Sequence, residues 1–234
     1  MPFLLILVVL LVAGIILVTF VPALFIRRWY VSKLKELSRG SLVLTYDDGP
    51  GERLTPRLLD LLNRYDAKAT FFLVGQCAEK APGLCDKIHA AGHEIGCHSQ
   101  HHHHSWCRLP SMIERDMNDG YRTLSRWIDR DAFFRPPFGE LTLWTWLTIR
   151  RRGIRVAWWT INAHDIEGSR QYTKYAKSIS QKLNHDGGGV ILLHCHDRSE
   201  DHAEYVLKIT EQLLLTAKEH GLQVCTVSEL FDSS

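Results

Sequence analysis

The sequence predicts an α/β protein in which βα units surround a parallel sheet or barrel, preceded by one transmembrane helix. Between residues 41 and 231, short apolar segments alternate with longer helical patterns about seven times, which is typical of βα units. Polar residues follow several of the apolar segments, and in a βα barrel the strand ends that carry such residues share one face. A continuous apolar run lies ahead of this pattern, at residues 3–26.

The composition indicates one large globular domain with its own core. The chain has 234 residues, an apolar fraction of 45% and a formal net charge of +2. It therefore lacks the strongly basic character of nucleic-acid-binding proteins, and no nucleic-acid partner is expected. The six cysteines match neither a Cys-x-x-Cys motif nor a compact disulfide framework. We expect all six to be free.

The apolar run at residues 3–26 is long enough to cross a bilayer as a helix. No Lys or Arg precedes it, so the basic start of a secretory signal is missing. Arg27, Arg28, Trp29 and Tyr30 follow it, and such a cluster is typical of an interfacial anchor. We therefore predict an uncleaved transmembrane anchor over 1–28, a basic linker over 29–40 and a globular domain over 41–234.

The first half of the domain alternates between strands and helices. Residues 41–44 form an apolar run that predicts a buried strand. Residues 55–65 carry leucines at 58, 59, 61 and 62, which is a helical spacing. A strand is expected at 69–74 and a helix at 76–91, each followed by glycine. A short strand at 94–96 leads into a histidine-rich segment.

The second half continues the alternation to the end of the chain. Strands are expected at 132–134, 155–159, 190–193 and 222–227, where apolar residues cluster in short runs. Helices are expected at 110–127, 141–151, 172–183 and 203–219. Gly153 and Gly221 follow the second and the last of these helices, as expected for helix ends.

Asp47 and Asp48 follow the strand at 41–44, and Gly49-Pro50 then turns the chain. Two carboxylates held close together are unfavourable unless a cation lies beside them. The pair therefore predicts a partner, either a metal or a base. The ordinary alternative is a simple Asp-Gly turn.

The partner is expected in the histidine-rich segment at 93–104. Imidazole is the commonest metal ligand, and His98 and His102 have the i, i+4 spacing that places both on one face of a helical turn. An aspartate and two histidines leave open positions on a divalent ion, as catalytic metal sites require. His101 and His103 are alternative ligands beside His102 without that spacing. A solvated histidine loop that binds metal without chemistry is the other interpretation.

Several motifs together resemble the polysaccharide deacetylases, carbohydrate esterase family 4. They are Thr45-Tyr46-Asp47-Asp48-Gly49-Pro50, the segment 69–75, Gly92-His93-Glu94-Ile95-Gly96, His98-Ser99-x-x-His102, Arg135-Pro136-Pro137-Phe138-Gly139 and Leu192-Leu193-His194. They occur in the family's order from about residue 41 to 231. The resemblance implies a distorted (β/α) barrel that removes acetyl groups from sugars with a divalent metal, Zn²⁺ first, with Co²⁺, Mn²⁺ or Ni²⁺ as alternatives.

The resemblance also implies a role for individual residues. Asp47 would be the general base, and Asp48, His98 and His102 would hold the metal. Arg135 would orient the base, and the backbone N–H of Phe138 would help to hold the oxyanion. His194 would be the general acid, polarised by Asp165, and Leu192 would line the pocket for the acetyl methyl group.

The chemistry of amide hydrolysis requires these residue types. A bound metal lowers the pKa of a nucleophilic water, a free carboxylate accepts its proton, and an arginine keeps that carboxylate ionised. A histidine can protonate the leaving amine. His196, close to His194, leaves the identity of the acid open at this stage.

One motif departs from the family pattern, which usually reads Asp-x-x-Asp-Trp. Here the sequence is Asn162-Ala163-His164-Asp165-Ile166, so the first acid is an amide and the pocket tryptophan is an isoleucine. This leaves the acyl specificity open. The prediction is a metal-dependent hydrolase that removes N-acetyl groups from an N-acetylated polysaccharide, oligosaccharide or lipid-linked sugar. The alternatives are a deformylase or other amide hydrolase on the same barrel, and an inactive metal-holding carbohydrate-binding module.

The protein is expected in the membrane. Two arguments disagree about the side of the membrane on which the globular domain lies. Basic residues follow the span, which favours a cytoplasmic domain, whereas the resemblance implies an exterior one. The short stretch between the span and the domain would keep the site near the bilayer, which suits a membrane-embedded substrate.

Overall fold

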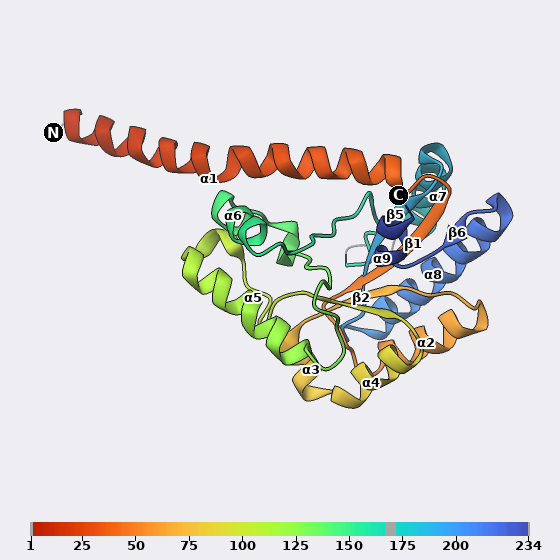
Figure 1. Cartoon of the computed structure of the whole chain (residues 1–234). Coiled ribbons are helices and arrows are strands. Elements are labelled where there is room, and N and C mark those ends of the chain that lie inside the picture. Colours follow the sequence, from red (N-terminus) through yellow and green to blue (C-terminus); the bar gives the residue numbers. More distant parts are fainter. Residues whose placement is uncertain (1, 167–171, 234) are drawn as a thin grey trace.

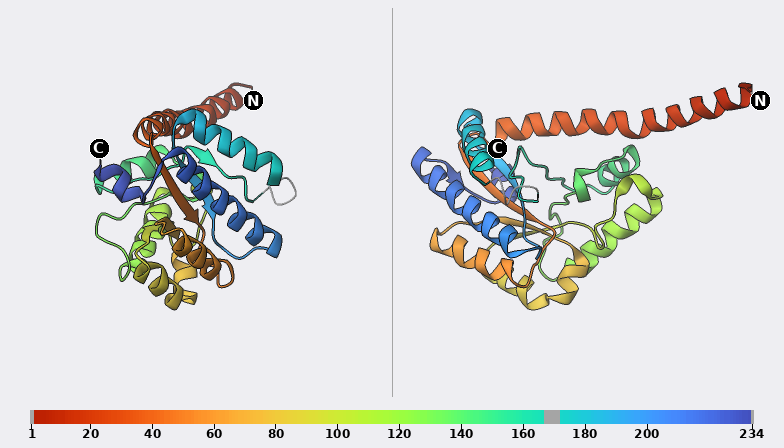
Figure 2. Two further views of the ribbon diagram at one scale, coloured as in Figure 1. Left: turned by 90° about the vertical axis from the view of Figure 1, so that its right-hand side faces the viewer. Right: turned by 180° about the vertical axis from the view of Figure 1, so that it is seen from behind.

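A computed structural model describes residues 2–166 and 172–233, without the side chains of residues 2, 18, 19, 22, 107 and 173. Its centre is a parallel sheet, shown with the surrounding helices in Figures 1 and 2. The strands are β1 (Ser41–Asp47), β2 (Thr70–Leu73), β3 (Glu94–Cys97), β4 (Ile161–Asn162), β5 (Gly189–His194) and β6 (Gln223–Val224). Their order is β3-β2-β1-β5-β4, and β6 pairs with the beginning of β1. The predicted α/β class with a parallel sheet is confirmed.

Helices connect the strands and cover the sheet. They are α2 (Leu54–Arg64), α3 (Gly75–Lys80), α4 (Pro82–Ala90), α5 (Pro110–Leu124), α6 (Leu143–Arg151), α7 (Tyr172–Asp186), α8 (Glu200–His220) and α9 (Val227–Asp232). Because β1 lies between β2 and β5 and is covered on both faces, its residues 42–47 are all buried. This burial explains its nearly continuous apolar sequence, which is typical of central parallel strands.

Several predicted elements differ from the structure. The strands expected at 132–134 and 155–159 are reduced to single bridges that join Phe134 to Cys97 and to Val156. The chain cannot continue as a regular strand here because two prolines follow Arg135, and proline has no N–H to donate. The strand expected at 222–227 ends at Val224, since Thr226 caps the unpredicted helix α9 together with Glu229.

The helix expected at 76–91 is two helices, α3 and α4. The break falls at Ala81, which precedes Pro82 and has φ −133° and ψ 56°. A residue before proline is disfavoured in the helical region, and Pro82 then begins α4, where its missing N–H has no cost.

The N-terminal segment is a single helix, α1 (Pro2–Leu37). Figure 1 shows it as a long rod along one side of the domain, with its N-terminal part extending beyond the other elements. Within the described part of the chain, no helix combines the length and the apolar character that a membrane crossing requires. The prediction of a transmembrane helix over 1–28 therefore finds no support. The apolar run is not a separate element, because it continues without a break into a charged segment that packs on the domain.

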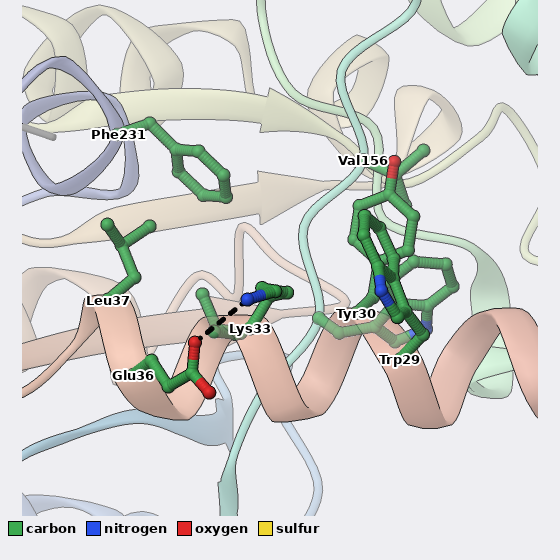
Figure 3. Close-up of a pocket in the computed structure, with 9 residues that line it drawn as sticks. Trp29, Tyr30, Lys33, Glu36, Leu37, Val156 and Phe231 are labelled. Atoms are coloured by element: carbon green, nitrogen blue, oxygen red, sulfur yellow. Dashed lines mark hydrogen bonds and ion pairs between the residues drawn. The ribbon is translucent and has the colours of Figure 1, made fainter.

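The C-terminal part of α1 makes aromatic contacts with the domain. The ring of Tyr30 lies 5.6 Å from Trp146 and 5.1 Å from Trp158 between centroids, and Arg27 lies 5.1 Å above the Trp159 ring. Leu34 is buried. Between this part of α1 and residues Val156 and Phe231 lies a largely apolar cavity of about 530 Å³, shown in Figure 3.

The cysteines agree with the prediction where they are described. Cys77, Cys85, Cys97, Cys195 and Cys225 are free thiols. The side chain of Cys107 lies outside the described residues.

Candidate active site

The carboxyl ends of the strands bring the predicted site residues to one edge of the sheet. Asp47 ends β1 and is in register with His194, which ends the neighbouring β5. His98 directly follows β3, and Asp165 lies three residues after β4. Leu192 is buried and lies two residues before His194, so the pleat of β5 places both on the same face. The parallel sheet therefore collects residues that are far apart in the sequence.

Arg135 fixes the position of the Asp47 carboxylate. Its side chain is completely buried, and its Nη1 donates to Asp47 Oδ1 and to Thr45 Oγ1, each at 2.7 Å. Its Nε and Nη2 donate to the carbonyl oxygens of Ala157 and Trp158. Arg135 therefore contacts only Oδ1 of Asp47. The other oxygen, Oδ2, lies 3.7 Å from His98 Nε2.

Asp48, His98 and His102 form a compact cluster beside Asp47. Asp48 Oδ1 lies 3.0 Å from His102 Nε2 and 3.3 Å from His98 Nε2. Each residue offers one ligand atom, and these atoms lie within 4.8 Å of one another. The helical turn expected for the histidines is wrong. Instead, positive φ angles at Ser99 (64°) and His102 (55°) fold the segment back, so that the two imidazole rings approach to 4.9 Å.

The hydrogen bonding of His98 explains why this cluster suits a cation. His98 Nδ1 lies 2.6 Å from the carbonyl oxygen of Arg135, and because a carbonyl can only accept, Nδ1 carries a proton. In its neutral form, which is the form that binds a metal, the ring directs the lone pair of Nε2 at Asp48 Oδ1, and this buried oxygen then has no hydrogen-bond donor. Two lone pairs that face each other repel unless a cation lies between them, and histidine metal ligands typically donate their other ring N–H to a carbonyl oxygen, as His98 does here. The three residues therefore fit a divalent metal.

The charge of Asp48 is consistent with this interpretation. Burial raises the pKa of Asp48, but hydrogen bonds from His102 and His98, and the positive charge of these rings when they are protonated, outweigh burial and hold that pKa well below its usual range. The carboxylate therefore remains ionised, as a metal ligand must be.

His194 is held by Asp165, its predicted partner. Asp165 Oδ2 accepts from the backbone N–H of His194 at 2.8 Å, and Asp165 Oδ1 lies 3.1 Å from His194 Nδ1. Burial lowers the pKa of His194, but the hydrogen bond and charge of Asp165, together with Asp47 and Asp48, outweigh it and raise this pKa to about 9. The imidazole is therefore protonated at neutral pH.

His196 has a different environment, which separates the two candidates for the general acid. Arg198 Nε donates to His196 Nε2 at 2.6 Å, and His196 Nδ1 lies 3.6 Å from Asp48 Oδ2. Burial lowers the pKa of His196 to about 4. Of the two histidines, His194 is therefore the one that carries a proton to donate at neutral pH.

Phe138 lies next to the cluster on the turn after Arg135. Its ring contacts His102, with centroids 4.4 Å apart, and stacks on His104 at 3.6 Å. Its φ of 58° lies in the left-handed region, which is uncommon for a residue with a side chain. Glu140 supports this turn, since it accepts from the backbone N–H of Ser105 and lies 2.8 Å from His104 Nδ1.

The departure from the family motif has a local structural consequence. Asn162 Oδ1 accepts from the backbone N–H of His164 at 2.7 Å, so the amide stabilises the turn that leads to Asp165. Ile166, which occupies the place of the usual tryptophan, is 44% exposed. Ile166 therefore does not close one side of an acyl pocket as a buried side chain would.

No sequence pattern marks His202, which is a buried residue of the site. His202 of α8 places Nε2 3.3 Å from Asp165 Oδ2, so Asp165 contacts two histidines. A histidine on the buried face of a long amphipathic helix has no distinctive pattern, and only its spacing of eight residues from His194 hints that one face of α8 meets the end of β5.

Comparison with known proteins agrees with this geometry. A family model described as polysaccharide deacetylase matches residues 35–157. A peptidoglycan-N-acetylglucosamine deacetylase of Bacillus cereus is 30% identical over 194 residues, which cover 81% of this chain and 87% of that protein.

Two solved structures resemble this chain along most of their length. The Bc1960 peptidoglycan N-acetylglucosamine deacetylase has a TM-score of 0.72 at 26% identity, and the match covers 84% of this chain and 90% of that one. A family 4 carbohydrate esterase from Streptomyces lividans in complex with acetate has a TM-score of 0.68 at 24% identity, with 80% and 92% covered. The second likeness shows a shared fold.

Proposed function

Because this chain belongs to the polysaccharide deacetylase family, carbohydrate esterase family 4, we propose that it is a metal-dependent hydrolase that removes N-acetyl groups from an N-acetylglucosamine-containing glycan. The observation that carries the metal dependence is the convergence of His98 Nε2 and His102 Nε2 on the buried Asp48 Oδ1, while His98 Nδ1 donates to the carbonyl oxygen of Arg135. A carbohydrate-binding module requires no such arrangement beside an oriented base and an acid.

Asp48, His98 and His102 would hold the metal. When bound, it would polarise the acetyl oxygen and acidify the attacking water. Asp47 would accept the proton of that water, because Arg135 occupies Oδ1 and leaves Oδ2 to act. A buried arginine at this distance fixes the orientation of the carboxylate through a charge-assisted hydrogen bond.

The leaving amine requires a proton, and His194 would supply it. Asp165 holds Nδ1, so Nε2 is the nitrogen available to the substrate. With a pKa raised to about 9, His194 begins the reaction protonated. After the transfer Asp165 still holds the neutral ring in the orientation that allows it to be reprotonated.

The substrate proposal rests on the relatives. Both the Bacillus cereus protein and the Bc1960 structure are described as peptidoglycan-N-acetylglucosamine deacetylases. Acetyl over formyl specificity is the finer part of this proposal, since Ile166 replaces the tryptophan that commonly forms part of the acyl pocket.

The test is acetate release from N-acetylglucosamine oligomers and from peptidoglycan by the metal-loaded chain. We expect release that depends on added divalent metal and is lost in Asp47→Asn. Formate release from N-formylated oligomers without acetate release would instead favour the deformylase. Retention of bound metal with no turnover on any of these substrates would favour the binding module.

A further inference from the structure

The histidines that follow β3 are divided between two places. His98 and His102 face Asp48, whereas His101 and His103 approach Asp116 of α5. His102 lies between these two in the sequence, but its Nε2 lies 3.0 Å from Asp48 Oδ1. His101 and His103 are therefore not used by the cluster proposed above, although they belong to the same run of four histidines.

Contacts with the main chain hold Asp116 beside His101 and His103. Its side chain is only 12% exposed, and its backbone oxygen accepts from the N–H of Gln100 at 3.0 Å. Its Oδ1 accepts from the backbone N–H of His101 at 3.2 Å and lies 2.7 Å from His101 Nδ1. The carboxylate is thus held beside an imidazole by main-chain contacts that do not depend on either ring.

The second imidazole completes a set of three ligands. The rings of His101 and His103 are almost parallel, with an interplanar angle of 18° and centroids 5.4 Å apart. One ligand atom from each of His101, His103 and Asp116 lies within 4.8 Å of the others. Ligands about 2.0–2.2 Å from a tetrahedral ion are separated by roughly 3.4 Å, so small side-chain rotations bring the three atoms to an ion. His101 is exposed, which leaves room for water as a fourth ligand.

We propose that His101, His103 and Asp116 form a second divalent-metal site, separate from Asp48, His98 and His102. Two imidazoles and one carboxylate favour a borderline ion such as Zn²⁺, Co²⁺ or Ni²⁺ over Mg²⁺ or Ca²⁺. The ion would join the segment 98–104 to α5. Because His102 lies between two of its ligands, the second site stabilises the segment that carries a ligand of the first.

The test is the number of zinc ions bound by the full chain after chelation and equilibrium dialysis. We expect about two equivalents in the unmodified chain. Asp116→Asn and His103→Ala should each lose one equivalent, and Asp48→Asn should lose the other. Asp116→Asn combined with Asp48→Asn should bind close to none, while circular dichroism shows that each variant remains folded.

His185→Ala is the matched control, because His185 also lies beside an aspartate, with Nδ1 3.0 Å from Asp186 Oδ1, but is otherwise exposed. It should retain both equivalents. Saturation of the unmodified chain at one equivalent would overturn the proposal, as would two equivalents that survive in both Asp116→Asn and His103→Ala.

Location provides a second, independent readout. A zinc-soaked crystal should show two anomalous peaks, one of them between His101, His103 and Asp116. A single peak at Asp48 would refute the second site whether or not the chain proves to be a deacetylase, since neither measurement depends on turnover.

Discussion

At the scale of single residues, the two adjacent aspartates have different surroundings and should respond differently to substitution. Asp48→Ala, His98→Ala and His102→Ala should each lose the metal of the Asp48 cluster together with activity. Asp47→Asn should retain this metal and lower turnover by about 10²–10⁴-fold, because it removes only the proton acceptor. Metal analysis beside an acetate-release assay separates the two effects. Undiminished metal at this cluster in His102→Ala would mean that His101 or His103 is the ligand.

The two histidines at the end of β5 should also differ. His194→Ala removes the group that is protonated at neutral pH and should lower turnover by about 10²–10⁴-fold with little change in bound metal. His196→Ala should have a much milder effect on turnover. Steady-state kinetics at equal metal loading provide the comparison. A larger loss in His196→Ala would reverse the assignment of the acid.

The alkaline limb of the pH–rate profile should report the state of His194. Its pKa is raised to about 9, so the protonated acid is present below that pH and is lost as the pH rises through it. Asp165→Asn removes the carboxylate that opposes the effect of burial, so the alkaline limb should move to lower pH by about one unit or more. An unchanged limb in a folded, metal-loaded variant would show that another group controls it.

At the scale of the elements, α5 touches the histidine segment through a glycine. A Cβ on Gly120 would lie 2.6 Å from the backbone carbon of Ser99 and 2.9 Å from its oxygen. Backbone atoms of Ser99 cannot shift without disturbing the neighbouring histidines. Gly120→Ala should therefore destabilise the fold by about 1–3 kcal/mol and weaken metal binding. Gly83→Ala in α4 is the control, because nothing lies within 4 Å of its Cβ. Thermal unfolding and metal titration of both variants test this prediction. Equal melting temperatures and equal metal affinities of Gly120→Ala and Gly83→Ala would refute it.

The strands that the sequence predicted well are those with long apolar runs. β1, β2 and β5 have such runs because neighbouring strands and helices bury both faces. The bridges at Phe134 and Val156, and the two-residue β4, depend on pairing with distant segments, so no local pattern marks them. The missed break between α3 and α4 is an exception, since Pro82 was visible and its effect on Ala81 follows from local sterics.

For the candidate site, the sequence indicated which residues take part but not the backbone conformation that brings them together. The clustering of Asp48, His98 and His102 could be predicted from their chemistry, but not the left-handed Ser99 and His102 that bring the rings together. Those conformations are held by tertiary contacts, such as the bond from Gln100 N–H to Asp116. The place of Arg135 in the site followed from the family resemblance, whereas its complete burial could be known only from the fold.

At the scale of the whole molecule, α1 consists of an exposed part and a packed part that should contribute unequally to stability. Side chains 3–17 are exposed, whereas Leu34 and Tyr30 pack against the domain near Trp158. A chain of residues 18–234 should therefore unfold at the same temperature as the full chain. A chain of residues 41–234 should lose about 2–5 kcal/mol, because it uncovers the apolar surface under α1. Calorimetry of the two truncations distinguishes them, and equal melting temperatures would contradict the packing role of α1.

The register between β1 and β5 has a further consequence for turnover. Asp47 and His194 are direct neighbours across two hydrogen-bonded parallel strands, and such strands are spaced about 4.8 Å apart. The separation between the proposed base and acid is thus a property of the backbone of the sheet. Neither group has to be delivered by a mobile loop when substrate arrives, so the catalytic pair is preassembled. The rate of the chemical step should accordingly be insensitive to solvent viscosity, unlike that of an enzyme whose acid and base meet only on closure.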